Sequence, residues 1–357
     1  MTLLWYIPNT IEPGHRGDTT TQGWGSLEHS TELALAAERN GWSGALIGTS
    51  WGRPDTFTLA TALAARTTTF RPLVAARPGY WQPAQFAAAA ATLDQLSQGR
   101  LLVNIVSGVD EPAAYGDPVV ASPDRYARTA EFMHVVRRLW TEENVTYHGQ
   151  FFTVEGSTVA SRPHGTPPTL YFGGASEAAE RVAAAEADVQ LFWGEPLEAI
   201  AGRIARLRRL SDEIGRRHAP LEFGLRVTTV VGDTTEDAWV TARARVARLR
   251  GQEPEPWWQG NRDHAVGQRR LYDLASQGEV LDTCLYTAPG SAGAGGAGST
   301  WLVGSATDVA GALHRYRELG VTHFILSDTP YLEQTAHQGQ VLLPLLRVRN
   351  PGQEPGP

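Results

Sequence analysis

One short stretch of the sequence combines glycine, a hydroxyl group and a helix start in an order that suits an anion. Residues 170–176 read LYFGGAS and lead directly into the alanine-rich run EAAERVAAAEA. Gly173 and Gly174 let a ligand approach the main chain, and the first turn of a helix after Ser176 offers unpaired N–H groups. A phosphate is therefore the first ligand to consider. The alternative is a tight strand-to-helix turn in which Ser176 only caps the helix.

Other polar and aromatic residues follow apolar runs, at positions where strands are expected to end. They are Thr49, Ser50, Trp51, Arg53, Arg77, Asn104, Ser107, Asp110, Trp193, Glu195, Arg226 and Thr228. The ten histidines are scattered without the pairing of a zinc site, and no nucleophile has an obvious base beside it. We therefore expect no metal. Indole walls, small hydroxyl groups and arginines suit an aromatic, phosphorylated organic cofactor.

Three of these residues also have a purely structural interpretation. Trp193 fits a core position, and Asn104 fits a cap on local backbone. Arg226 lies in the apolar run EFGLRVTTVV, and its side chain is expected to point into the protein interior. Because a buried arginine needs a partner, we favour a functional role for Arg226.

The elements that must position these side chains alternate between strand and helix patterns, as in a parallel sheet wrapped by helices. The expected strands are residues 3–8, 44–50, 71–78, 100–108, 169–174, 188–194, 222–231 and 322–328. Between them, apolar residues repeat with a helical period of about 3.6 residues. Gly99 and Gly320 are expected to end two of these helices. Eight strands favour a closed (β/α)8 TIM barrel, which carries its chemistry at the carboxyl ends of the strands.

We expect residues 1–350 to form one barrel domain with insertions at about 109–121, 147–160 and 251–304, and residues 351–357 to form a disordered tail. The insertion at 147–160 has the pattern of a hairpin. The insertion at 251–304 contains the tract GSAGAGGAGST, for which a disordered linker and a lid over the catalytic face are both open interpretations.

The overall composition narrows the class of protein. The chain has 357 residues, of which 42% are hydrophobic and 19% charged, and it contains no run of about 18 apolar residues. All 31 basic residues are arginine, so lysine-dependent chemistry such as a Schiff base is excluded. A net charge of −7 and the lack of a basic run argue against a nucleic-acid partner. The single cysteine, Cys284, fits a reducing compartment. We expect a soluble cytoplasmic protein with no membrane contact.

Several stretches together resemble the FMN-dependent, bacterial-luciferase-like monooxygenases, and within them the alkanesulfonate monooxygenase branch. They are GRLLVNIVSG, RYARTAEFMHVVRRLW, PPTLYFGGASEAAERVAAAEADVQLFWGEP, FGLRVTTVVGDTTEDAW and LVGSATDVAGALHRYRELGVTHFILSDTPYLEQTAHQGQVLLPLL. The resemblance implies a (β/α)8 barrel in a two-component system. A separate NAD(P)H:FMN reductase would supply reduced FMN, and this protein would use O2 to form a flavin C4a-hydroperoxide that oxygenates a small organic substrate.

The resemblance also implies roles for residues of this sequence. Gly174, Ala175 and Ser176 match the phosphate site of the family. The flavin contacts are expected to include Asn104, Ser107 and Tyr126, together with Thr49 and Arg77, which follow the second and third strands. Trp193 and Arg226 match residues that line the active site.

Four positions depart from the pattern of the sulfonate enzymes. Arg53 or a neighbour stands where they have a cysteine, Thr228 replaces a histidine, and Thr329 replaces a tyrosine before proline. Ala294 or a neighbouring small residue replaces a lid arginine. We place Arg53, Thr228 and Thr329 with Arg226 and Trp193 in the catalytic group.

These departures remove groups that suit an oxyanion, so the hypothesis is that the substrate is not a simple alkanesulfonate. Arg53 would compensate from another side, or the substrate is less charged and packs against Trp51, Trp81 and Trp193. In the second case a nitrogen, a sulfur or a carbonyl carbon would receive the oxygen.

Two alternative functions stay open. One is the related group of deazaflavin (F420)-dependent oxidoreductases, which share the barrel and transfer hydride without O2. The other is a catalytically inactive flavin-binding protein. Relatives are commonly dimers or tetramers, so a homodimer or homotetramer is expected.

Overall fold

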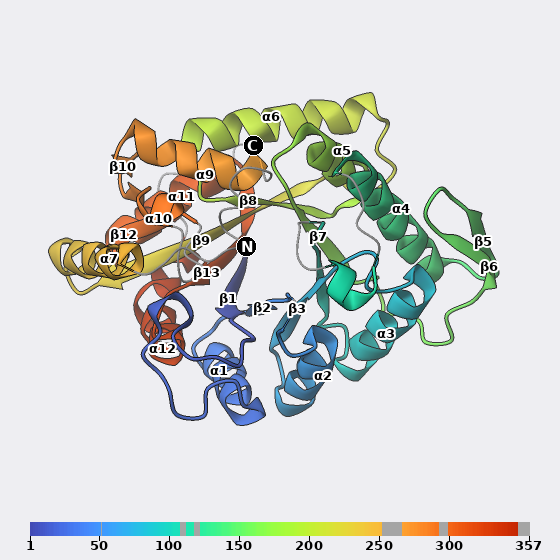
Figure 1. Ribbon diagram of the computed structural model, residues 1–357, viewed down its shortest axis with the longest axis horizontal. Coiled ribbons are helices and arrows are strands. Elements are labelled where there is room, and N and C mark those ends of the chain that lie inside the picture. The colour runs from blue at the N-terminus through green and yellow to red at the C-terminus, as the bar shows by residue number, and fades with distance from the viewer. Residues whose placement is uncertain (51, 108–111, 118–121, 252–265, 293–298, 349–357) are drawn as a thin grey trace.

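The computed structural model of the chain is a closed parallel barrel surrounded by helices (Figure 1). The structure describes all residues except 51, 108–111, 118–121, 252–265, 293–298 and 349–357. Eight strands hydrogen-bond in the order β1-β2-β3-β4-β7-β8-β9-β13, and β13 pairs again with β1. The predicted TIM barrel is therefore confirmed.

Each predicted barrel strand has a counterpart within a few residues of the expected range. The strands are β1 (Thr2–Ile7), β2 (Gly44–Ile47), β3 (Arg71–Ala76), β4 (Leu102–Ile105), β7 (Thr169–Gly173), β8 (Val189–Trp193), β9 (Glu222–Gly232) and β13 (Val321–Ser327). Their sequences are nearly continuous apolar runs because both faces of a barrel strand are covered, one by the barrel interior and one by helices.

The helices form the outer layer of the barrel. They are α1 (Leu27–Arg39), α2 (Thr56–Arg66), α3 (Pro83–Leu96), α4 (Ser122–Thr141), α5 (Glu177–Glu186), α6 (Leu197–Glu213), α11 (Ala306–Glu318), α12 (Tyr331–Val341) and α13 (Leu343–Arg347), with short 3-10 turns η1 (His15–Gly17) and η2 (Pro112–Tyr115). Local sequence sets where several of them begin. Ser305 and Asp308 form a reciprocal capping box on α11. Gly99 and Gly320, the predicted helix ends, have φ of 79° and 106°, a region that glycine enters without strain.

Strand β9 is longer than the other barrel strands and extends beyond the barrel, where it pairs with a further strand of the same sheet. Its first half pairs with β8, and its second half, Thr228 to Gly232, pairs with β12 (Trp301–Ser305). The sheet continues through β11 (Leu285–Tyr286) to β10 (Val280–Leu281). Strand β12 lies inside the predicted insertion 251–304 and was not predicted, although it is a short apolar run, because it directly follows the glycine tract.

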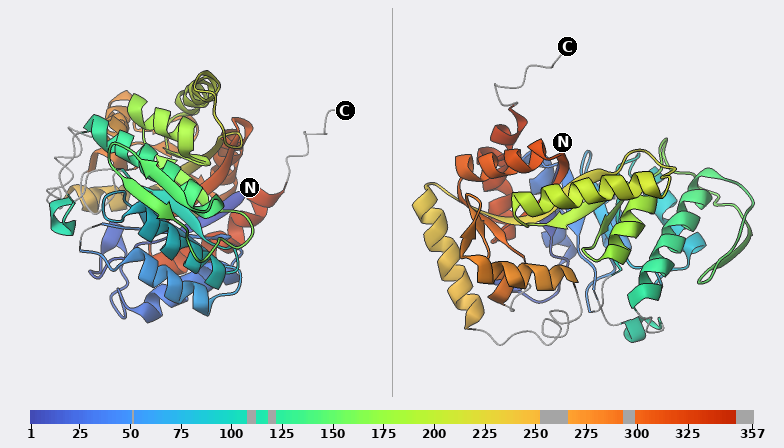
Figure 2. Two further views of the ribbon diagram at one scale, coloured as in Figure 1. Left: turned by 90° about the vertical axis from the view of Figure 1, so that its right-hand side faces the viewer. Right: turned by 90° about the horizontal axis from the view of Figure 1, so that it is seen from above.

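The predicted hairpin is formed by β5 (Val145–His148) and β6 (Thr153–Ser157). This β5–β6 hairpin and helix α7 (Thr235–Arg250) lie at the two ends of the long axis of the molecule, in both Figure 1 and the right view of Figure 2. The last insertion also contributes α9 (Val266–Gln277) and α10 (Pro289–Ala292). The central part of the glycine tract lies outside the described residues, as does Ala294. In the described part of the chain, no helix is long and apolar enough to span a membrane.

Candidate active site

The turn between β7 and α5, residues 173–176, has the geometry that its sequence predicts. Ser176 is the N-cap of α5, and its Oγ accepts a hydrogen bond of 3.2 Å from the backbone N–H of Ala179. This bond uses a lone pair, so the hydroxyl hydrogen can still be donated to an anion. Gly174 must be glycine, because a Cβ at that position would lie 2.4 Å from the Cβ of Ala179. The turn therefore places main chain, hydroxyl and helix N-terminus together at the barrel rim.

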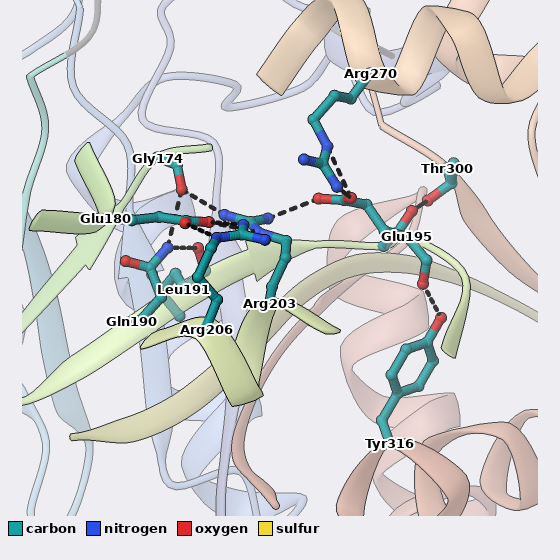
Figure 3. Close-up of polar contacts among 11 residues, drawn as sticks. Gly174, Glu180, Gln190, Leu191, Glu195, Arg203, Arg206, Arg270, Thr300 and Tyr316 are labelled. Carbon is teal, nitrogen blue, oxygen red and sulfur yellow. Dashed lines mark hydrogen bonds and ion pairs between the residues drawn. The ribbon is translucent and has the colours of Figure 1, made fainter. Parts of the chain in front are cut away.

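A buried ion network supports this turn from below (Figure 3). The Arg203 guanidinium of α6 donates three hydrogen bonds. They are 2.6 Å to the carbonyl oxygen of Gly174, 3.0 Å to Glu180 and 2.7 Å to Glu195. Arg206 adds two further bonds to Glu180. Since Arg203 is only 2% exposed, its charge requires these two carboxylates, and the network fixes the Gly174 carbonyl in one orientation.

The same network reaches the insertion helix α9. Arg270 of α9 donates 3.0 Å from Nε to Glu195, the residue that follows Gly194 at the end of β8. A Cβ built on Gly267 in the first turn of α9 would lie 3.7 Å from Ala175 and 3.8 Å from the Trp193 indole. The start of α9 thus packs beside both the Gly173–Ser176 turn and Trp193.

The end of β4 supplies two predicted cofactor contacts. Asn104 Oδ1 is buried and has no hydrogen-bond partner, which is unusual for a buried amide oxygen. Ser107 Oγ lies 2.6 Å from Thr129 Oγ1, which itself donates to the Arg125 carbonyl. Ser107 must therefore donate its hydrogen to Thr129, and it can meet a ligand only as an acceptor. Tyr126, on the same helix α4, is partly buried against the core.

Arg226 on β9 meets two residues from the first strand and the loop after it. Its guanidinium carbon lies 4.4 Å from the centroid of the Tyr6 ring, and the guanidinium carbon of Arg16 lies 5.0 Å from the same centroid. Arg226 Nη1 donates a weak hydrogen bond of 3.3 Å to Ser327 Oγ. Arg226 is 9% exposed and Tyr6 5%. The structure therefore gathers positive charge around a buried phenol.

The charges at this cluster change the proton affinities of its members. Burial, followed by repulsion from Arg16, lowers the pKa of Arg226 to about 10. Burial alone would raise the pKa of Tyr6, but Arg53, Arg16 and Arg226 outweigh it and lower that pKa. Burial and the same arginines hold the pKa of His15 well below its usual value, so this imidazole is neutral near pH 7.

Two of the catalytic candidates lie beside a small polar recess. Thr228 and Thr329 line a cavity of about 20 Å³ together with Arg16, Ser327 and Tyr331. Thr228 Oγ1 lies 3.4 Å from Ser327 Oγ, and Thr329 Oγ1 donates 3.2 Å to the Arg16 carbonyl. A volume of this size holds one water or one ligand oxygen.

The remaining candidates occupy other parts of the rim. Arg53 Nη1 donates 2.5 Å to the Pro8 carbonyl, so this side chain braces the loop after β1. Thr49 and Arg77 follow β2 and β3 and are partly buried. Trp81 contacts Phe57, with ring centroids 5.4 Å apart, and therefore lies at the edge of the core. Trp51 and Asp110 lie outside the described residues.

Sequence reasoning missed the residues that surround Arg226. Tyr6 carries a weak signal, a hydroxyl within the apolar run LLWYIP, whereas Arg16 lies in a loop without periodicity. Ser327 was included in a strand but was not considered as a site residue. In the part of the chain that the structure describes, no group of three His, Cys, Asp or Glu residues is placed to hold a metal ion.

Comparison with known proteins places this geometry in context. Residues 1–323 match a family model described as "Luciferase-like monooxygenase". A solved structure of EDTA monooxygenase (EmoA) from Chelativorans sp. BNC1 superposes with a TM-score of 0.78 at 18% identity, covering 97% of this chain and 93% of that one. The structure of riboflavin lyase (RcaE) with modified FMN and riboflavin superposes with a TM-score of 0.76 at 20% identity, covering 97% of this chain and 92% of that one. An F420-dependent secondary alcohol dehydrogenase superposes with a TM-score of 0.70 at 18% identity, covering 98% of this chain and 100% of that one. At these identities the structural likeness shows the shared fold.

Proposed function

Since the chain belongs to the luciferase-like monooxygenase family, we propose that it is the oxygenating component of a two-component flavin-dependent monooxygenase. It would use reduced FMN and O2 to oxygenate a small organic substrate. The observation that carries this proposal is the Gly173–Ser176 turn, which presents main-chain N–H groups and a hydroxyl at the start of α5 on the catalytic rim of the barrel.

The residues around this turn fit a phosphorylated flavin. Gly174, Ala175 and Ser176 would hold the phosphate. The unpartnered Asn104 Oδ1 and the acceptor Ser107 Oγ fit the N–H or hydroxyl groups of a flavin. Tyr126 from α4, and Thr49 and Arg77 from the ends of β2 and β3, would complete the flavin contacts. When bound, reduced flavin supplies the electrons with which O2 becomes an oxygenating agent.

The other side of the site would hold the substrate. Arg226 supplies a buried positive charge that can stabilise negative charge as it develops, and it has only a weak bond to Ser327 to break. Trp193, beside the start of α9, would form an apolar wall and exclude water. Thr228 and Thr329 supply hydroxyl groups at the recess, and Arg53 braces the loop after β1 against Pro8.

The proposal has consequences for partners and location. In the proposed two-component system, a separate NAD(P)H:FMN reductase would reduce FMN and deliver it to this protein. We further propose a cytoplasmic homodimer or homotetramer that acts on a small molecule, with no nucleic-acid or membrane partner.

Single-turnover labelling with oxygen tests this function. Protein loaded anaerobically with photoreduced FMN is mixed with ¹⁸O₂ in the presence of organic sulfonates, carboxylates, amines, thioethers or ketones, and products are analysed by mass spectrometry. We expect one labelled oxygen atom in an organic product. Formation of hydrogen peroxide with every compound would indicate a flavin-binding protein without oxygenase activity, and binding of F420 in preference to FMN would indicate a hydride-transfer enzyme.

A further inference from the structure

Two arginines at the candidate site lack a negative partner. Arg16 from η1 and Arg226 from β9 both lie within about 5 Å of the Tyr6 ring centroid. Among the residues described by the structure, no carboxylate forms an ion pair with either guanidinium; the hydrogen bond of Arg226 goes to the Ser327 hydroxyl. Arg16 Nε is buried without an acceptor. Two positive charges therefore lie close together on one aromatic ring.

Two acids that lie beside the recess, Asp18 and Asp328, are already engaged elsewhere. The two carboxylate oxygens of Asp18 accept 2.7 Å hydrogen bonds from the backbone N–H groups of Thr20 and Tyr331. Asp328 is ion-paired with Arg245 and also faces the recess. Burying a guanidinium without a counter-charge is costly, and two neighbouring ones repel each other. The arrangement is therefore completed most simply by an anion that comes from outside the chain.

A recess beside the two arginines matches an oxygen atom in size; Arg16 lines it, and Arg226 reaches it through its hydrogen bond to Ser327. Ser327 accepts from Arg226 and lines the recess of about 20 Å³ whose walls include Arg16. The hydroxyl groups of Thr228 and Thr329 border the same recess. One oxygen of a sulfonate or carboxylate would fit there beside the Arg16 guanidinium and the Thr228 and Ser327 hydroxyl groups, whereas the Thr329 hydroxyl already donates to the Arg16 carbonyl.

We propose that Arg16 and Arg226, together with the Thr228 and Ser327 hydroxyl groups, bind an oxyanion group carried by the organic substrate. The ligand class is a sulfonate or carboxylate with an organic body that extends toward Trp193. This inference rests on the proposed function for the identity of the site, but the anion site itself does not require flavin. The positive charge of Arg16 favours an anionic substrate over the less charged alternative that the sequence left open.

Binding measurements on the intact protein test the proposal without turnover. Butane-1-sulfonate, butanoate and the neutral butyl methyl sulfone are titrated calorimetrically, with and without FMN, and sodium sulfate is included to detect a site for free inorganic anions. We expect the organic anions to bind at least tenfold more tightly than the sulfone and than sulfate. Equal binding of the sulfone, or no binding of either organic anion, would overturn the proposal, as would preferential binding of sulfate.

Variants then assign the site to residues. Arg16→Gln is expected to weaken binding of the preferred anion by at least tenfold, and Arg16→Lys by less, while affinity for reduced FMN stays within twofold. Arg39→Gln, at an exposed position of α1, removes the same charge and should change neither affinity. Loss of FMN affinity in Arg16→Gln with unchanged anion binding would assign the arginine to the flavin and overturn the proposal. Anion binding by a protein that fails to bind any flavin would keep this site while refuting the proposed oxygenase.

Discussion

Arg203 donates a 2.6 Å hydrogen bond to the Gly174 carbonyl oxygen while it is ion-paired with Glu180 and Glu195. The proposed phosphate turn is partly exposed to solvent, and a buried charge network holds its Gly174 carbonyl. Because the start of α9 contacts the same network through Arg270, the position of the turn depends on side chains from α5, α6, α9 and the end of β8.

Replacing Arg203 by methionine is expected to destabilise the protein by about 3–5 kcal/mol, because it leaves two buried carboxylates without their shared partner. The free energy of unfolding in urea measures this loss. Arg206→Gln is the matched control, since Arg206 also contacts Glu180 but its side chain is 46% exposed; it should cost less than about 1 kcal/mol. Similar losses for both variants would contradict the role assigned to burial.

Gly174→Ala is expected to destabilise the protein by about 1–3 kcal/mol and to weaken FMN binding, because the new Cβ would overlap Ala179 and shift the turn. At Gly173 the nearest atoms to an added Cβ are 3.8 Å away, so Gly173→Ala should fold with nearly unchanged stability. Thermal or urea unfolding of the two variants gives the comparison. Equal stability of Gly174→Ala and the parent protein would show that α5 tolerates the displacement.

Arg226→Ala is expected to slow oxygenation by on the order of 100-fold with little change in flavin affinity, because the lost group stabilises charge at the substrate side. Rates come from ¹⁸O incorporation, and affinity comes from anaerobic titration with reduced FMN. Arg226→Lys, which keeps a positive charge, should recover part of the rate. Unchanged turnover in Arg226→Ala would remove this residue from the active site.

Asp328 is expected to make stability depend on pH. Burial outweighs the attraction of Arg245 and raises the pKa of this carboxyl to about 6, from 3.8. The unfolded chain therefore releases this proton at lower pH than the folded protein, so stability falls as pH rises from 4 to 6, by about 3 kcal/mol. Urea unfolding at several pH values measures the slope. Asp328→Asn should lack this component, whatever its absolute stability, and an identical slope in both proteins would contradict the assignment.

The sequence predicted the barrel well because its strands are local apolar runs separated by periodic helices, each readable by itself. The Gly173–Ser176 turn was also readable, since close approach and helix capping restrict residue types at consecutive positions. The Arg16, Tyr6 and Arg226 cluster was not, because it joins residues more than 200 positions apart in the chain. Strand β12 was missed for a different reason: its short apolar run directly follows the glycine tract, which was predicted to belong to an insertion.

The substrate side was the least predictable part. Departures from a family pattern report what has been removed, but they do not report a charge supplied from a new position. Arg16 enters the site from a non-periodic loop, with Thr329 donating to its carbonyl, and this contact exists only in the folded chain.

The most direct test of the account is an anaerobic binding comparison between reduced FMN and reduced riboflavin, which lacks the phosphate. If the Gly173–Ser176 turn binds the phosphate, reduced FMN should bind at least tenfold more tightly, a difference of about 1.4 kcal/mol or more. Ser176→Ala and Gly174→Ala should narrow that difference. Equal affinity for the two flavins, or binding of F420 alone, would contradict the assignment of this turn and of the cofactor.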